Sequence, residues 1–176
     1  EITSVRGCIE LMAQPVIVAI EGDAIGAGFE LALACDVRIA SEDAMFAIPD
    51  VAMGLLPSGG ATARLPRLAG RGLAAEMLLL GERIDGRRAA AAGVVNEALP
   101  HPGVRPRAEQ LADTVAAQGP LAVRYAKEAI LRGLDVPLPE ALRLETDLTV
   151  ILQTTADRAE GVQAFLEKRP PRFENG

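Results

Sequence analysis

The uninterrupted apolar run Pro15-Val-Ile-Val-Ala-Ile20 limits the folds open to this chain more than any other feature. Its β-branched residues favour a strand, and the lack of polar alternation predicts that both faces of the strand are covered. Gly22 ends the run, and Gly26-Ala27-Gly28 opens a predicted helix that extends to about Ala34. A buried strand that leads directly into a helix is typical of an α/β sheet flanked by helices.

Shorter patterns extend this prediction along the chain. Further extended segments are expected at 37–40, 45–48 and 94–99. Helices are expected over 2–13, 61–68, 73–80, 86–92, 104–117, 120–132, 138–152 and 155–167, with Pro66 cutting the second of these. We therefore expect a unit with strands over 1–100 and a helical region over 101–176. Prolines 100, 102 and 106 are expected to mark a linker between them.

Composition excludes several classes of function. A net charge of −6 and a pI near 4.9 argue against a nucleic-acid partner. No apolar run is long enough to cross a membrane, so no membrane partner is expected. One histidine and two distant cysteines cannot build a metal centre. Cys8 and Cys35 are interpreted as buried free thiols, which fits a reducing, cytoplasmic location.

Two carboxylates, Glu30 and Asp50, stand at the ends of apolar runs, where burying an acid requires a partner or a function. The adjacent glycine turn is not a dinucleotide fingerprint, because Leu31 occupies the place of the third glycine. It is not a P-loop either, since no Gly-Lys-Ser/Thr follows. Two interpretations stay open. The turn either brings backbone N–H groups close to a ligand oxygen, or serves only as a tight strand-to-helix turn.

Several segments, read together and in order, resemble the enoyl-CoA hydratase/isomerase family, the crotonase superfamily. They span nearly the whole chain and correspond to the C-terminal two thirds of the family's domain. The segments are Pro15–Gly22, Gly26–Asp36, Phe46–Asp50, Gly54–Gly60, Arg64–Arg67, Thr154–Asp157, Glu160–Gly161 and Ala164–Pro170.

The resemblance implies a spiral of ββα units with a C-terminal helical region, and an acyl-CoA thioester as substrate. It maps the two catalytic acids onto Glu30 and Asp50, and one oxyanion-hole N–H onto Ala27. The family usually has glutamate where this chain has Asp50, whose carboxylate lies about 1.5 Å further back because one C–C bond is missing. The second oxyanion donor is expected from a segment upstream of Glu1, so little activity is expected from residues 1–176 alone.

The resemblance also assigns binding residues. Those of the acyl substrate are Gly26, Gly28, Pro49, Gly54 and Leu55, and those of the coenzyme A nucleotide are Phe165 and Lys168. For Lys168 a simpler alternative is a solvated cation at the end of a helix. For Asp50 the alternative is a turn residue after Pro49.

The expected function is therefore an enoyl-CoA hydratase that needs no cofactor beyond the coenzyme A of its substrate. An enoyl-CoA isomerase is the alternative within the family, because one acid suffices to move a proton. A non-catalytic fragment or an oligomeric scaffold is the alternative of another class. The apolar stripe from Leu138 to Leu152 is either core or a subunit interface, and the family's habit predicts a homotrimer or hexamer.

Overall fold

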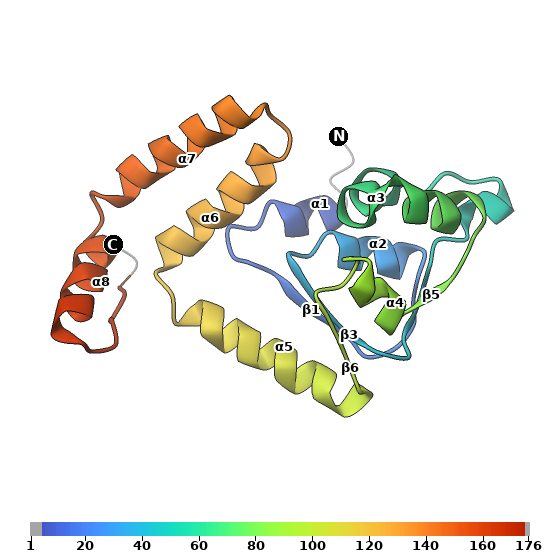
Figure 1. Cartoon of the computed structure of the whole chain (residues 1–176), viewed down its shortest axis with the longest axis horizontal. Coiled ribbons are helices and arrows are strands. Elements are labelled where there is room, and N and C mark those ends of the chain that lie inside the picture. The colour runs from blue at the N-terminus through green and yellow to red at the C-terminus, as the bar shows by residue number, and fades with distance from the viewer. Residues whose placement is uncertain (1–4, 175–176) are drawn as a thin grey trace. The chain divides into compact units, whose positions relative to one another are not determined.

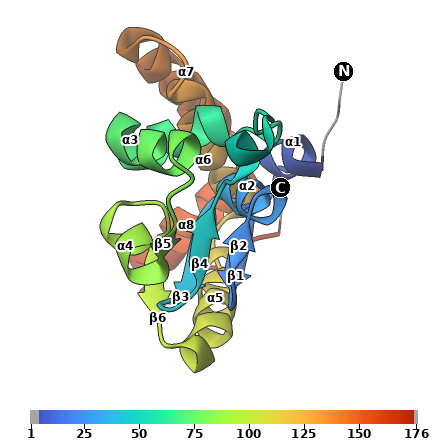
Figure 2. The same ribbon diagram turned by 90° about the vertical axis from the view of Figure 1, so that its right-hand side faces the viewer.

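The structure is a computed structural model that describes residues 5–174. Its contacts divide the chain into two compact units (Figures 1 and 2). The first unit comprises the residues up to Met12 together with Val16–Ala112, and the second comprises Ala13–Pro15 and Asp113–Gly176. The division falls after Ala112, whereas the sequence placed it at residue 100.

The first unit contains all the strands that the structure describes. Its helices are α1 (Val5–Glu10), α2 (Ala27–Leu33), the 3-10 helix η1 (Asp50–Met53), α3 (Ala61–Leu79), α4 (Gly86–Ala91) and most of α5 (His101–Ala116). Its strands are β1 (Ile17–Ile20), β2 (Ala24–Ile25), β3 (Val37–Ser41), β4 (Met45–Ala47), β5 (Ile84–Asp85) and β6 (Glu97–Leu99). The helix expected over 2–13 is confirmed only in its middle, and residues 2–4 lie outside the described residues.

The strands form two small sheets. One has the order β1-β3-β6 and is parallel, with Ile17 opposite Val37 and Ile39 opposite Glu97. The other has the order β2-β4-β5, in which β2 and β4 are parallel and β4 and β5 antiparallel. Parallel strands joined through helices fit the predicted α/β class.

The prediction that the first strand is covered on both faces is wrong for the described residues. β1 has only β3 as a neighbour, and along it Ala19 is exposed while Ile17 and Val18 are half-buried. An edge strand has one unpaired side, and this one is also only partly covered. The central strand β3 is the buried one, with Ile39 and Ala40 completely inaccessible.

The core of the first unit lies between the strands, α2 and α3. Phe29 of α2 and Phe46 of β4 are completely buried, and their ring centroids are 5.2 Å apart. Leu31 of α2 is 38% exposed. A seven-residue helix has a narrow buried face, and α2 points Phe29 and Glu30 into the core rather than Leu31.

The prediction that Pro66 cuts a helix is wrong. It lies inside α3, and the break comes at Gly70, whose φ of 75° and ψ of 164° are not helical. Proline costs one intrahelical hydrogen bond, but it keeps a helical φ, and here the helix continues through it. Glycine reaches a positive φ without a steric penalty, so the break moves to Gly70.

The proline-rich linker is also not observed. α5 begins at His101, and Pro102 and Pro106 lie within it. Pro102 is tolerated because the first-turn N–H groups of a helix have no carbonyl partner in the helix. Val104 and Ala108 of α5 pack on Ile39 of β3, so this segment covers the β1-β3-β6 sheet instead of linking two units.

The second unit is built from helices only, as predicted. They are α6 (Pro120–Gly133), α7 (Leu138–Leu152) and α8 (Ala156–Glu167), and Figure 1 shows α6 and α7 side by side. Along the predicted stripe of α7, Leu148 is buried, but Leu138 and Leu142 are 71% and 52% exposed. The stripe is therefore not a core within this chain.

Two remaining sequence predictions concern single residues and membranes. Cys35 is buried, but Cys8 is exposed, so the interpretation of both cysteines as buried thiols is wrong for Cys8. Cys8 lies on the short helix α1. Among residues 5–174, no helix is both long and apolar enough to span a bilayer.

Candidate active site

Glu30 is the buried acid of this chain that is best placed for chemistry. It lies on α2, and only 3% of its surface is exposed. Its Oε1 accepts hydrogen bonds from the backbone N–H groups of Gly59 (2.7 Å) and Ala61 (3.2 Å). These two donors stand at the start of α3, where the helix dipole also favours negative charge. Main-chain N–H groups thus help to orient the carboxylate.

The turn that begins α2 explains how Glu30 comes to lie there. Gly26 adopts φ 54° and ψ −120°, a conformation that a side chain would strain, and its N–H donates to the Ala47 carbonyl of β4 (2.8 Å). The Gly26 carbonyl accepts the N–H of Glu30 (2.9 Å) as the first bond of the helix. Ala27 is therefore the first residue of α2, and the geometry of a helix leaves its N–H without an intrahelical acceptor.

Asp50 lies at the same turn. It is the first residue of η1 and is half-buried, and its Oδ2 is 3.9 Å from the point where a Cβ on Gly26 would stand. Glu30, through its N–H bond to the Gly26 carbonyl, and Asp50, through its carboxylate, therefore both adjoin Gly26, although they are twenty residues apart in the sequence. This arrangement suits acid–base chemistry on a group held at the turn.

The other residues predicted to bind the acyl group surround this turn. Pro49 precedes η1, and Gly54 ends it with a φ of 70°. Leu55 follows and is 57% exposed. Next to Gly28 there is open space where a Cβ would point. Their location is consistent with substrate contact, and their roles stay predictions.

Sequence reasoning missed the donors of Glu30. Gly59 and Ala61 were expected only to precede or begin a helix, and their N–H groups turn out to hold the buried carboxylate. The signal was present, because a glycine pair before a helix exposes several N–H groups that need an acceptor. The sequence did not show which acceptor would meet them, since Glu30 lies far away along the chain.

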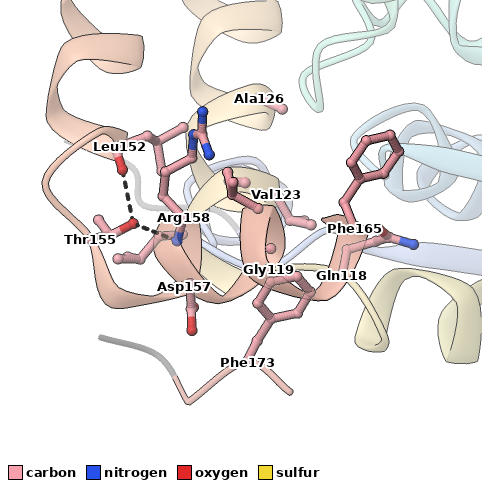
Figure 3. A pocket seen from close by; sticks show the side chains of 14 residues that line it. Gln118, Gly119, Val123, Ala126, Leu152, Thr155, Asp157, Arg158, Phe165 and Phe173 are labelled. Atoms are coloured by element: carbon pink, nitrogen blue, oxygen red, sulfur yellow. Dashed lines mark hydrogen bonds between the residues drawn. The ribbon is translucent and has the colours of Figure 1, made fainter. Parts of the chain in front are cut away.

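Phe165 and Lys168 lie in the second unit. Lys168 is the C-cap of α8 with a φ of 55°, a location that agrees with the simpler alternative of a helix-end cation. Phe165 is 82% exposed and lines a cavity of about 630 Å³ formed by α6, α8 and the C-terminal segment (Figure 3). Figure 3 shows Phe173 beside Gly119 in this cavity. The assignment of Phe165 and Lys168 to coenzyme A stays a prediction.

Acidic, histidine and cysteine side chains do not gather into a possible metal site anywhere in the described part of the chain. His101, the only histidine, is exposed at the start of α5.

Comparison with known proteins supports the resemblance that the sequence motifs indicated. The sequence profile of the enoyl-CoA hydratase/isomerase family matches residues 7–176. The 2,3-dehydroadipyl-CoA hydratase of Escherichia coli is 42% identical over 94% of this chain and 65% of its own length. The crotonyl-CoA hydratase of Syntrophomonas wolfei is 39% identical over 94% of this chain and 64% of its own length.

A solved structure shows the same fold. The enoyl-CoA hydratase of Bacillus anthracis superposes with a TM-score of 0.94 at 42% identity, covering 97% of this chain and 66% of that one. The fold is thus the crotonase-type α/β fold, and the chain belongs to the enoyl-CoA hydratase/isomerase family. The predicted resemblance is confirmed. The chain spans less than two thirds of the length of the curated relatives that it matches.

Proposed function

We propose that this chain carries the acid–base centre of an enoyl-CoA hydratase, which adds water to the double bond of a 2-enoyl-CoA thioester. The observation that carries the proposal is the buried Glu30 carboxylate, held by two backbone N–H groups beside the glycine turn that Asp50 also approaches. A buried and oriented carboxylate is a candidate for a functional site.

In the proposed reaction, the N–H of Ala27 donates to the thioester oxygen as it becomes negative. Such a donor acts on the transition state, because the oxygen carries most charge when the enolate forms. One acid accepts a proton from water as the water oxygen bonds to C3. The other delivers a proton to C2, so the elements of one water molecule are added and the charge of the site is unchanged.

The two acids are not equivalent. Glu30 is almost fully buried and oriented by Gly59 and Ala61, whereas Asp50 is half-buried and one methylene shorter than glutamate. This difference supports one alternative, an enoyl-CoA isomerase, in which Glu30 alone removes a proton and returns it at another carbon. A general base has to reach its proton directly or through one water, so the shorter Asp50 is the residue that separates the two reactions.

The decisive experiment uses the protein together with the upstream segment that is expected to supply the second oxyanion donor. It compares this protein with its Glu30→Gln variant on crotonyl-CoA and on a 3-enoyl-CoA. Glutamine keeps the size of the side chain and can still accept the N–H bonds, but it cannot take up a proton. We expect kcat to fall by about 10²–10⁴-fold, which is the usual contribution of a general acid or base, while KM stays within a few-fold. Native turnover by Glu30→Gln on both substrates would show that the assignment is wrong.

The substrate class and the assembly are part of the proposal. The two hydratases named above are described as acting on 2,3-dehydroadipyl-CoA and crotonyl-CoA, which supports a thioester of coenzyme A as substrate here. Hydration moves protons and no electrons, so we propose no cofactor beyond that coenzyme A. The exposed Cys8 thiol, which forms no disulfide, supports a reducing, cytoplasmic location.

We also propose a homo-oligomer, a trimer or a hexamer, because the second unit exposes Leu138, Leu142 and Phe165 in the single chain. Large exposed apolar side chains on neighbouring helices are typical of surfaces that another subunit covers. Light scattering should give a mass of three or six chains at micromolar concentration. A monomer at that concentration would contradict this part of the proposal.

A further inference from the structure

Arg64, in the second turn of α3, is a side chain with an unusual set of contacts. Its guanidinium folds back toward the start of its own helix, where Nη1 donates to the Gly59 carbonyl (2.8 Å). Nε and Nη2 donate to the Glu10 carboxylate of α1 at 3.4 and 2.5 Å. The side chain of Arg64 is only 20% exposed, and that of Glu10 is 39% exposed. The guanidinium therefore joins α1 to the turn before α3.

The turn is shaped to admit this guanidinium. Gly60 has a φ of 98°, and a Cβ on it would stand 2.0 Å from Nη1 of Arg64. Any side chain at position 60 would thus displace Arg64 as well as strain the backbone. Gly60 leaves room for Arg64, but the two consecutive glycines, Gly59 and Gly60, also give the turn more conformational freedom than other residues would.

The same turn holds Glu30. The N–H of Gly59 donates to Oε1 of Glu30, and the carbonyl of Gly59 accepts from Arg64. Both the N–H and the carbonyl of Gly59 are therefore hydrogen-bonded. The N–H of Ala61 also donates to Glu30. We propose that Arg64, anchored by Glu10, is a positioning residue that fixes the 59–61 turn and through it the carboxylate of Glu30. The inference rests on the proposed function for its catalytic consequence, but not for its geometry.

The choice of arginine has a physical reason. A guanidinium presents several N–H donors in a rigid plane, so it can bind a carboxylate and a carbonyl at the same time. A partly exposed ion pair contributes little to stability, so the main effect of Arg64 should be on geometry. Geometry matters at such a site, because a misplacement of about 1 Å can cost about 10²-fold in rate.

The activity test uses Arg64→Met, which keeps the aliphatic stem, and Arg67→Met as its matched control. Arg67 lies on the same helix and also donates to a backbone carbonyl, that of Ala63, but does so at the exposed surface. We expect Arg64→Met to lower kcat by about 10- to 100-fold, with KM within about threefold, and Arg67→Met to change neither by more than about twofold.

A double substitution separates positioning from a general structural role. If Arg64 acts through Glu30, Arg64→Met should lower kcat by less than about twofold further once Glu30→Gln is present, because coupled residues are not additive. An equal loss in both backgrounds would overturn the proposal. Arg64→Lys, which keeps the charge and loses the planar fork, should recover only part of the activity.

The closing experiment does not depend on turnover. Hydrogen–deuterium exchange of a peptide spanning residues 57–61 reports the N–H groups that bind Glu30. We expect about tenfold faster exchange at Gly59 and Ala61 in Arg64→Met, a smaller increase in Glu10→Gln, and none in Arg67→Met. Glu10→Gln serves if Arg64→Met does not fold. Unchanged exchange in both would refute the positioning role, whereas absence of hydration by the native protein would refute only the proposed function.

Discussion

The two units of the chain differ in how far they bury the side chains that the proposals depend on. In the first, Glu30 is 3% exposed and its carboxylate is held by main-chain donors from the same unit. In the second, Phe165 and Leu138 are 82% and 71% exposed, with no other part of their unit covering them. The first unit thus supplies hydrogen-bond donors to Glu30 from its own residues. The second unit leaves large apolar side chains exposed.

This difference separates what a single chain can build from what needs a second molecule. A buried acid needs its hydrogen-bond partners in place as soon as the unit folds, since an unsatisfied buried charge is costly. Exposed apolar side chains carry a much smaller penalty and gain their stabilisation only when something covers them. The first unit is therefore expected to depend on its own sequence, and the second on what binds to it.

A matched pair of phenylalanine truncations tests this difference between the units most directly. Phe29 is completely buried in the first unit, so Phe29→Ala should lower the free energy of unfolding by about 3–5 kcal/mol. Phe165→Ala, at a side chain that is 82% exposed in the single chain, should change it by less than about 0.5 kcal/mol as long as no other subunit covers Phe165. Urea unfolding at one fixed protein concentration measures both. Equal losses would mean that Phe165 is as well covered in solution as Phe29.

Two glycines provide a second pair. A Cβ on Gly86 would lie 2.0 Å from the carbonyl oxygen of Ser41, so Gly86→Ala should destabilise the protein by about 1–3 kcal/mol. A Cβ on Gly119 of the second unit would meet Phe173 at an ordinary 3.6 Å, so Gly119→Ala should cost less than about 0.5 kcal/mol. Thermal melting of the two variants side by side tests this, and a larger shift for Gly119→Ala would reverse the comparison.

Asp50 tests how complete the first unit's site is. Asp50→Glu restores the length that the family usually has, and it should raise crotonyl-CoA hydration severalfold if the reach of the acid limits the native rate. Asp50→Asn should lower kcat about 10-fold or more in a hydratase and leave an isomerase nearly unchanged. Steady-state kinetics on both substrates distinguish these outcomes. If both variants keep native kinetics, Asp50 is only a turn residue.

The smallest effect is expected at the surface of the second unit. Hydrogen bonds from the Arg169 guanidinium, and then from the Arg172 N–H, lower the pKa of Glu160 from 4.5 to about 2. Because the folded-state pKa is the lower one, this contact stabilises the fold above pH 4.5, and the stabilisation is lost as the pH falls toward 2.

Carbon-13 NMR of the Glu160 carboxyl should follow this titration, and Arg169→Gln should move its midpoint back toward 4.5. The side chains are exposed, so salt should weaken the effect. A midpoint near 4.5 in the native protein would show that the ion pair between Glu160 and Arg169 does not persist in solution.

Much of the fold followed from local patterns. β3, β4, α2 and the helices of the second unit lie close to the predicted ranges, because their apolar periodicity and their glycine boundaries act within a few residues. The predicted helix bounds were wrong where packing against other parts of the chain determines the structure. Pro66 was expected to cut the helix that is α3, and the prolines near residue 100 were expected to form a linker before a helix over 104–117. Instead α3 continues through Pro66 and α5 begins at His101, because packing on the sheet and core outweighs one lost hydrogen bond.

The sequence alone determined the family and the position of the glycine turn, and its resemblance to the family named Glu30 and Asp50 as the candidate acids. These are properties of residue type and order. Only the tertiary structure decided that Gly59 and Ala61 hold Glu30, that Arg64 and Glu10 meet at the same turn, and that Asp50 reaches Gly26. Such contacts join residues that are far apart along the chain, and a linear pattern does not specify which donor will meet which acceptor when the backbone folds.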